Sequence, residues 1–350
     1  MARFRTNLAF GAVSVAAILL SIAVLMAYLS AAPSASVVRL GYFPNVTHAQ
    51  ALYGIATGFY QRYLGAGITL DAKAFSAGPI ALQALLSNQL DMIFVGPSPT
   101  LNGLTVAPDV LRVIAGGASG GALFVIQPGL VLATSADYTG KKFATPLAGN
   151  TQDIALKHFL LTQGHKTLDQ PGGDVDVINA ANADILSSFK LGQIDGAWVP
   201  EPWATRLVRE ASGRVFLDER SLWPGGQFVT TQLVTTKRYL DAHRSDRLIR
   251  NFLDAQVSLT LLLQNATTAA LGIVNDAIGN ATGSRLADAT IAEAFTHLNV
   301  TYDPIKTSLA TYLTWAQELA FLPTGVSTNG LYDLTLLNDV LMTRGLPPVM

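Results

Sequence analysis

The chain has 350 residues, of which half are apolar and only 13% are charged. This length and composition allow one large domain or two medium ones with a sizeable core, and they argue against a disordered protein. The absence of cysteine excludes disulfides, thiolate metal sites, cysteine nucleophiles and a lipid-modified cysteine anchor. The formal net charge is −1 and no basic patch occurs, so nucleic acid is a poor candidate partner.

The sequence predicts that residues 1–36 form a leader that is not part of the folded domain. Arg3 and Arg5 precede the uncharged run 8–32, which is typical of a signal peptide or an N-terminal membrane anchor. The length of this run favours an anchor, because a spanning helix needs about 20 apolar residues. Small residues at 30–32 and 34–36 favour cleavage, and both alternatives stay open. In either case the remainder is exported, to the periplasm or the outer face of the cytoplasmic membrane.

The first part of the exported chain alternates strands and helices. Alternating β-branched residues predict a strand over 37–42, and the loop 43–48 separates it from a helix over 49–63. A second strand over 68–74 then leads into a strand–helix–strand unit.

That unit occurs twice, at a constant offset of 104 residues. Residues 70–95 match residues 174–199 as strand, helix, turn and strand, and Asp91 falls on Asp195 without a gap. Each copy ends in a Pro-x-Pro loop. The repeat predicts two similar α/β lobes, with ligand bound beyond the carboxyl ends of the strands, where both loops lie.

A glycine-rich stretch, residues 116–121, lies between the two copies and feeds an apolar run over 122–126. It fits either a crossing between lobes or a close approach of the backbone to a ligand. It is not a dinucleotide fingerprint, because it precedes a strand instead of opening a helix.

The rest of the chain completes the second lobe and returns to the first. A helix over 152–163 is capped by Asn150 and Thr151, and a strand over 227–235 carries the return crossing. After residue 237 we expect only helices, over 237–264, 267–278, 285–297, 307–319 and 328–342. The expected division is 37–124 plus 232–350 for lobe 1, and 125–231 for lobe 2.

Several predicted helices start at the strand ends that face the presumed cleft. Their unpaired N–H groups and partial positive charge suit an anion, and hydroxyl and amide side chains nearby add uncharged donors. Taken alone, the polar residues at each helix start could be an ordinary helix cap. Trp203 and Trp223 could form pocket walls, whereas Trp198 lies inside a strand and belongs to the core. Glu201 could meet a ligand amine, the other lobe, a membrane partner or only solvent.

No catalytic set is recognisable in the sequence, and the five histidines show no metal-ligand spacing, so we expect neither an enzyme nor a metal or cofactor site.

The order and spacing of several motifs resemble the extracytoplasmic solute-binding proteins of ABC importers, in the nitrate/sulfonate/taurine branch. The motifs are RLGYFPNVTHAQ (39–50), AGP (77–79), DMIFVGP (91–97), KKFATP (141–146), GNTQD (149–153) and GQIDGAWVPEPW (192–203). The resemblance implies the periplasmic-binding-protein fold of type II, with two α/β lobes on two hinge crossings. It also implies a monomer that delivers its ligand to an ABC permease and its ATPase. The ligand contacts that it implies are Asn45, Thr47, His48, Gly78, Pro79, Pro97, Ser98, Ser119, Gly120, Asn150, Thr151, Glu201 and Trp203.

Three hypotheses remain open at this point. The first is capture of a small oxyanion, with an aliphatic sulfonate, taurine or nitrate preferred. The second keeps the fold but exchanges the ligand for a thiamine-precursor pyrimidine or another heterocycle, motivated by Trp203 and Trp223. The third is an exported enzyme or sensor domain that uses the same cleft.

Overall fold

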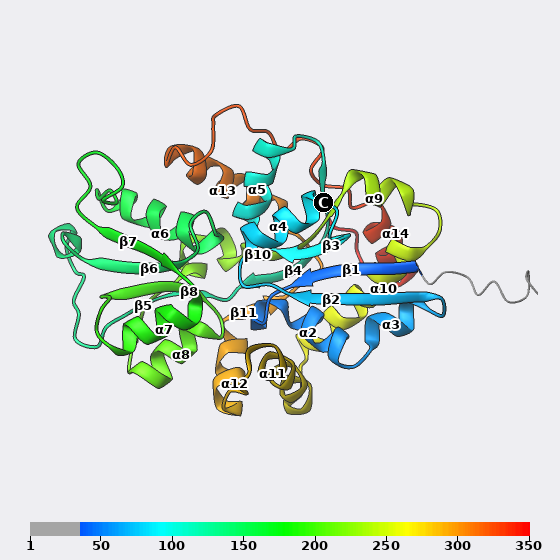
Figure 1. Cartoon of the computed structure of the whole chain (residues 1–350), viewed down its shortest axis with the longest axis horizontal. Helices are drawn as coiled ribbons and strands as arrows, with labels where there is room; N and C mark the ends of the chain where they lie inside the picture. The colour runs from blue at the N-terminus through cyan, green and yellow to red at the C-terminus, as the bar shows by residue number, and fades with distance from the viewer. Residues whose placement is uncertain (1–35) are drawn as a thin grey trace, which may run out of the picture.

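Two α/β lobes, each built on one mixed sheet, make up the computed structural model, which describes residues 36–350 (Figure 1). The predicted fold class, a type II periplasmic-binding-protein fold of two α/β lobes joined by two crossings, is confirmed. The predicted leader lies, except for Ser36, outside the described residues.

The first lobe contains a six-stranded sheet with the order β11-β4-β10-β3-β1-β2. Its strands are β1 (Ser36–Tyr42), β2 (Ile68–Ala74), β3 (Met92–Val95), β4 (Leu111–Gly120), β10 (Val229–Thr236) and β11 (Leu298–Val300). Strands β3, β4 and β10 are buried throughout, and β3 (MIFV) is accordingly a continuous apolar run. The helices on its two faces are α2 (Ala49–Ala56), α3 (Phe59–Leu64), α4 (Gly78–Leu86), α5 (Pro97–Val106), α9 (Lys237–Ala242), α10 (Leu248–Gln264), α11 (Thr268–Thr282) and α14 (Thr335–Thr343).

The second lobe contains a five-stranded sheet with the order β7-β6-β8-β5-β9. Its strands are β5 (Ala122–Ile126), β6 (Lys142–Pro146), β7 (Asp176–Ala180), β8 (Gly196–Pro200) and β9 (Arg214–Asp218). Its helices are α6 (Thr151–Thr162), α7 (Asn182–Lys190) and α8 (Trp203–Ala211), and the short 3₁₀ helices of the whole chain are η1 (Val46–His48), η2 (Ser135–Tyr138), η3 (Glu219–Leu222) and η4 (Pro224–Gly226).

The sequence repeat corresponds to a structural repeat. The parallel strands β2-β1-β3 of the first lobe have the same arrangement as β7-β6-β8 of the second, and each set is flanked by an antiparallel strand. The matching aspartates have matching contacts: Asp91 accepts the backbone N–H of Arg39, and Asp195 accepts that of Lys142, each at 2.8 Å. The repeated aspartate therefore ties the start of β3 to β1 in the first lobe and the start of β8 to β6 in the second.

The chain passes between the sheets twice. The first passage, at Gly120 and Gly121, has φ of +76° and +78°, a conformation that glycine adopts without steric cost. The second passage, from the second lobe back to the first, leads into β10. Strands β5 and β10 begin at Ala122 and Val229, three residues before the expected boundaries at 125 and 232. Strand β4 continues through the glycine-rich stretch. A Cβ on Gly116 would lie 2.2 Å from the carbonyl oxygen of Asp303, so this glycine admits the backbone of a later segment of the same chain.

Several helices were predicted wrongly, including the one over 237–264, which is broken between α9 and α10. The helix expected over 49–63 is broken between α2 and α3 at Gly58, whose φ is +65°. The C-terminal region, expected to be purely helical, contains β11, a three-residue strand on the edge of the first sheet; it also has no helix over residues 328–334.

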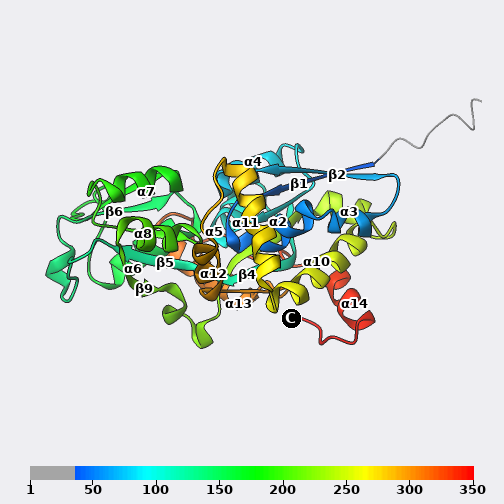
Figure 2. The same cartoon turned by 90° about the horizontal axis from the view of Figure 1, so that it is seen from below.

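Two later helices, α12 (Asp288–Thr296) and α13 (Lys306–Glu318), reach from the first lobe to the second. Helix α12 packs against α8, and α13 packs against α6 (Figures 1 and 2). His158 of α6 stacks on Trp315 of α13 with a centroid distance of 4.4 Å. The expected division assigned residues 232–350 to the first lobe, and within that range α12 and α13 also contact helices of the second lobe.

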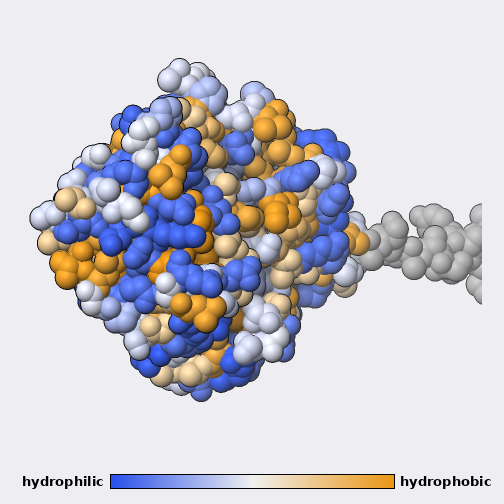
Figure 3. All heavy atoms as spheres, turned by 60° about the vertical axis from the view of Figure 1, so that its left-hand side comes forward, coloured by the Kyte–Doolittle hydropathy of each residue, from blue (hydrophilic) through white to orange (hydrophobic). Residues whose placement is uncertain are grey.

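No single helix within residues 36–350 is long and apolar enough to cross a membrane. One sharply bent pair, α10 with α11, reaches the necessary length and composition only when joined, across a bend of 119°. Both helices contribute side chains to the core of the first lobe. Figure 3 shows hydrophilic residues mixed with separate apolar patches on the face that it presents.

Candidate ligand-binding site

A small cavity lies between the lobes, at the carboxyl ends of the parallel strands. Its volume is about 30 Å³, and residues of both lobes line it. The first lobe contributes Phe43, Asn45, Thr47, His48, Ser76, Ala77, Gly78, Gly96, Thr230 and Thr231, and the second contributes Asn150, Thr151, Gln152, Asn182 and Pro200. Ligands of open α/β sheets bind at this position.

Four helices begin at the cavity: α4 and α5 from the first lobe, and α6 and α7 from the second. The residues that precede them make no side-chain capping hydrogen bond. The first N–H groups of a helix have no partner within the helix, and its amino terminus carries a partial positive charge. The four starts together form a surface of N–H donors that suits an anion.

Three side chains of the lining have a buried polar atom without a hydrogen-bond partner among the described residues. These atoms are Thr151 Oγ1, Asn182 Oδ1 and Thr231 Oγ1. A buried polar group without a partner costs free energy, so such groups usually meet water or a ligand. Their position on one cavity indicates that a polar ligand completes the site.

His48 is a neutral hydrogen-bond donor in this wall. Its side chain packs edge-on against Phe43 and Phe94, at centroid distances of 4.7 and 6.3 Å. Complete burial lowers its pKa to about 3, so the ring is uncharged at neutral pH. The backbone N–H of Phe43 donates to Nδ1 at 3.4 Å, which places the ring proton on Nε2.

The described residues that line the cavity include no aspartate, glutamate, lysine or arginine. Recognition here therefore uses helix dipoles, backbone N–H groups, hydroxyls, amides and a neutral imidazole. This set can solvate one diffuse negative charge without forming an ion pair.

The lobes are closed around the cavity. Trp203 of the second lobe donates its Nε1–H to Asn45 Oδ1 of the first at 3.1 Å. The guanidinium of Arg206 lies over the Trp203 ring, 4.5 Å from its centroid. The enclosed volume is far below the several hundred Å³ of a pocket for a drug-sized ligand, so only a small group fits in this arrangement.

Comparison of the sequence with known protein families identifies the family of this chain. The model of the NMT1-like family matches residues 31–273, which is more than half of the chain. The chain belongs to the NMT1-like family.

Several relatives and similar structures are named for the small molecules that they bind. The taurine-binding periplasmic protein of Escherichia coli (strain K12) is 24% identical over 178 residues, 51% of this chain and 52% of that protein. The chain matches about half the length of such curated relatives. The alkanesulfonate-binding protein SsuA of Xanthomonas axonopodis pv. citri, bound to MOPS, has a TM-score of 0.66 at 18% identity, covering 89% of this chain and 99% of its own. The nitrate-binding protein NrtA of Synechocystis PCC 6803 has a TM-score of 0.70 at 17% identity, covering 90% and 91%.

The structure of this NMT1-like chain brings part of the predicted site together. The predicted residues that line the cavity are Asn45, Thr47, His48, Gly78, Asn150 and Thr151. Pro79 and Pro97 lie one residue beyond the lining, in the first turns of α4 and α5. The buried hydroxyl of Ser98 has no partner among the described residues, but Ser98 is not part of the lining.

The remaining predicted residues lie at the hinge or at the cleft edge. Ser119 Oγ accepts the backbone N–H of Phe228 at 3.2 Å, and Gly120 belongs to the first crossing. Glu201 is fully buried and contacts His297, while Trp203 joins the lobes through Asn45.

Trp223 does not form a wall of the cavity. It is buried beside Phe228, Tyr312 and Trp315 near the second crossing, with ring centroids 4.6 to 5.3 Å apart. Trp198, predicted to belong to the core, is fully buried there, as expected.

Sequence reasoning missed several residues of the lining. The repeat could have found Asn182, because the offset of 104 residues takes the predicted Gly78 to it. The same offset relates Gly96 to Pro200, and both line the cavity, but neither was predicted. It could not have found Thr230 and Thr231, which come from β10, a strand that returns from the second lobe.

Proposed function

We propose that this chain is the substrate-binding component of an ABC import system. It captures a small oxyanion outside the membrane, preferably an aliphatic sulfonate, taurine or nitrate, and delivers it to the permease and its ATPase. The lobes rotate about the two crossings to admit and release the ligand. In this proposal the protein acts as a monomer and binds without turnover.

The observation that carries the proposal is the wall of neutral donors in a closed interlobe cavity. Four helix starts, the His48 imidazole and the unpartnered Thr151 and Thr231 hydroxyls all converge there. A sulfonate or nitrate presents several oxygens that share one negative charge, and it can accept many such hydrogen bonds at once. The relatives support the same class, since their names state taurine, alkanesulfonate and nitrate as ligands.

The heterocycle alternative has less support. It depended on Trp203 and Trp223 as the walls of a flat pocket. Trp223 is buried near the second crossing, and Trp203 lies at the cleft edge with its indole N–H donated to Asn45. Neither tryptophan lines the cavity.

A thermal-shift screen of alkanesulfonates, taurine, nitrate, phosphonates and thiamine precursors tests the proposal. We expect sulfonates, taurine or nitrate to raise the melting temperature, because a ligand that binds only the folded state stabilises it. Stabilisation by neutral heterocycles alone would contradict the oxyanion assignment, and turnover of any ligand would contradict a purely binding role.

A further inference from the structure

Glu201 and His297 flank the first crossing between the lobes. Glu201 follows β8 of the second lobe, and His297 lies between α12 and β11 of the first. The backbone of Gly121 joins them: its N–H donates to the carbonyl oxygen of His297 at 2.8 Å, and its carbonyl oxygen accepts the N–H of Glu201 at 2.9 Å. The two residues thus enclose the crossing strand from opposite sides.

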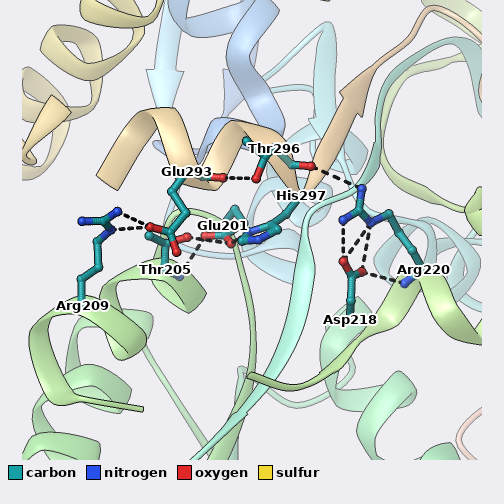
Figure 4. Close-up of polar contacts among 8 residues, drawn as sticks. All are labelled: Glu201, Thr205, Arg209, Asp218, Arg220, Glu293, Thr296 and His297. Carbon is teal, nitrogen blue, oxygen red and sulfur yellow. Dashed lines mark hydrogen bonds and ion pairs between the residues drawn. The ribbon is translucent and has the colours of Figure 1, made fainter. Parts of the chain in front are cut away.

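Their side chains meet beside this strand (Figure 4). His297 Nδ1 lies 2.5 Å from Glu201 Oε1. The Glu201 carboxylate is completely buried, and it also accepts the backbone N–H of Thr205 at 3.0 Å and its hydroxyl at 2.9 Å. These contacts fix the carboxylate at the start of α8, so it cannot follow His297 if α12 moves away.

Other polar contacts surround the pair and also join the lobes. Arg209 of α8 pairs with Glu293 of α12. Arg220, which is bonded to Asp218, donates to the carbonyl oxygen of Thr296 at 3.3 Å. All of these contacts connect α12 of the first lobe with elements of the second, outside the covalent crossings (Figure 4). Rotation of one lobe against the other must therefore alter them.

We propose that Glu201 and His297 form a clasp that favours the closed arrangement of the lobes, and that protonation of His297 tightens it. The clasp links the open–closed equilibrium to pH. Its effect on ligand affinity rests on the proposed function, but its effect on lobe separation does not.

The charges around His297 determine the sign of this effect. Its pKa is raised above the ordinary 6.5, chiefly by the hydrogen bond to Glu201; Asp218 adds to the rise, while burial and Arg220 oppose it. Arg209 and Glu293 lie farther out and neutralise each other. Closure therefore favours the protonated ring: the clasp is strongest below pH 6.5 and weakens as pH rises through the raised pKa.

Lobe separation can be measured directly, because the chain contains no cysteine. Leu191 of the second lobe is 71% exposed and Met342 of the first is 61% exposed. A full-length protein carrying Leu191→Cys and Met342→Cys accepts one spin label on each lobe. We would measure the label distance without ligand from about pH 5 to about pH 8, where histidine titrates.

We expect the closed-to-open ratio to fall at least about fivefold across this range, the lower end of typical coupling between sites. His297→Gln should abolish the pH dependence, and Arg209→Ala should retain it because that substitution leaves the Glu201–His297 contact in place. A label distance that does not change with pH in the parent, or that still changes with pH in His297→Gln, would overturn the proposal.

A second measurement does not depend on lobe motion. An NMR titration of the His297 ring should give a pKa above 6.5 in the wild-type protein and a lower one in Glu201→Gln. Equal values in the two proteins would refute the clasp. Failure to bind any sulfonate, taurine or nitrate, with an intact pH response of the label distance, would refute the proposed ligand alone.

Discussion

Gly96 of the first lobe and Thr151 of the second meet so closely that a Cβ on Gly96 would lie 2.3 Å from Thr151 Oγ1. Gly96 precedes α5 and Thr151 begins α6, so two of the helix starts at the cavity are in direct contact. The absence of a side chain at residue 96 is what allows the lobes to close to this degree.

Gly96→Ala should therefore hinder closure without unfolding the first lobe. The φ of Gly96 is −74°, which alanine adopts without strain, and the nearest atom of its own lobe would be the Thr230 carbonyl oxygen at 3.3 Å. Overpacking costs about 1–3 kcal/mol, so we expect ligand affinity to fall roughly 5- to 150-fold. Calorimetry measures the affinity, and circular dichroism checks the fold.

Gly272→Ala is the matched control, because a Cβ at that position in α11 would have no neighbour within 4 Å. It should leave the affinity unchanged and stabilise the helix by about 1 kcal/mol. An unchanged affinity in Gly96→Ala would refute the steric role of residue 96.

Thr151→Val tests the unpartnered hydroxyl in the cavity wall. The substitution keeps the shape of the side chain but removes Oγ1, which has no partner among the described residues. We expect the affinity for the oxyanion to fall by about 1–3 kcal/mol, with no loss of stability in the ligand-free protein. The control is Thr162→Val in the same helix, whose hydroxyl donates to the carbonyl oxygen of Phe159 away from the cavity. Equal affinities in the two variants would exclude a ligand contact at Thr151.

His48 should remain neutral throughout the physiological range. Burial lowers its pKa from 6.5 to about 3, so the folded state resists protonation that the unfolded chain accepts below pH 6.5. Its contribution to stability is therefore present above pH 6.5 and decreases as the pH falls towards 3. An NMR titration should show a neutral ring, with the proton on Nε2, down to about pH 4. Protonation of this ring near pH 6 would contradict the neutral-donor role.

Glu219 should make the stability of the folded state depend on pH with the opposite sign to His48. Burial raises its pKa from 4.5 to about 7, although Tyr312 and Trp198 both donate to the carboxylate, at 2.5 and 2.8 Å. The folded state then holds a proton that the unfolded chain releases, so this contribution to stability is lost as pH rises from 4.5 to about 7. The expected change is about 3 kcal/mol. Urea unfolding of the wild type and Glu219→Gln at the two ends of this range measures it, and parallel pH profiles would refute it.

The repeat made the two lobes predictable because its turns and strands are determined by residues that are close together in the sequence. Asn88 and Gly192, 104 residues apart, both have positive φ, at 59° and 66°, and each turns the chain from a helix into a buried strand. Asp91 and Asp195 then accept backbone N–H groups of β1 and β6, respectively. Turns and strands of this kind depend on neighbouring residues, so they can be predicted from a single sequence.

The remaining features depend on contacts between distant segments. Strand β11 exists because residues 298–300 pair with the end of β4, and Thr231 reaches the cavity because β10 runs between β3 and β4. Trp223 was predicted as a possible pocket wall, but it is buried against α13, some 90 residues later in the chain. No local pattern in the sequence carries this information.

Calorimetric titration of the purified protein with ethanesulfonate, taurine and nitrate tests the central claim most directly. We expect saturable binding of one molecule per chain by at least one of these oxyanions, weakened by Gly96→Ala and by Thr151→Val. Binding of neutral heterocycles alone, or oxyanion binding that both substitutions leave unchanged, would contradict the site described between the lobes.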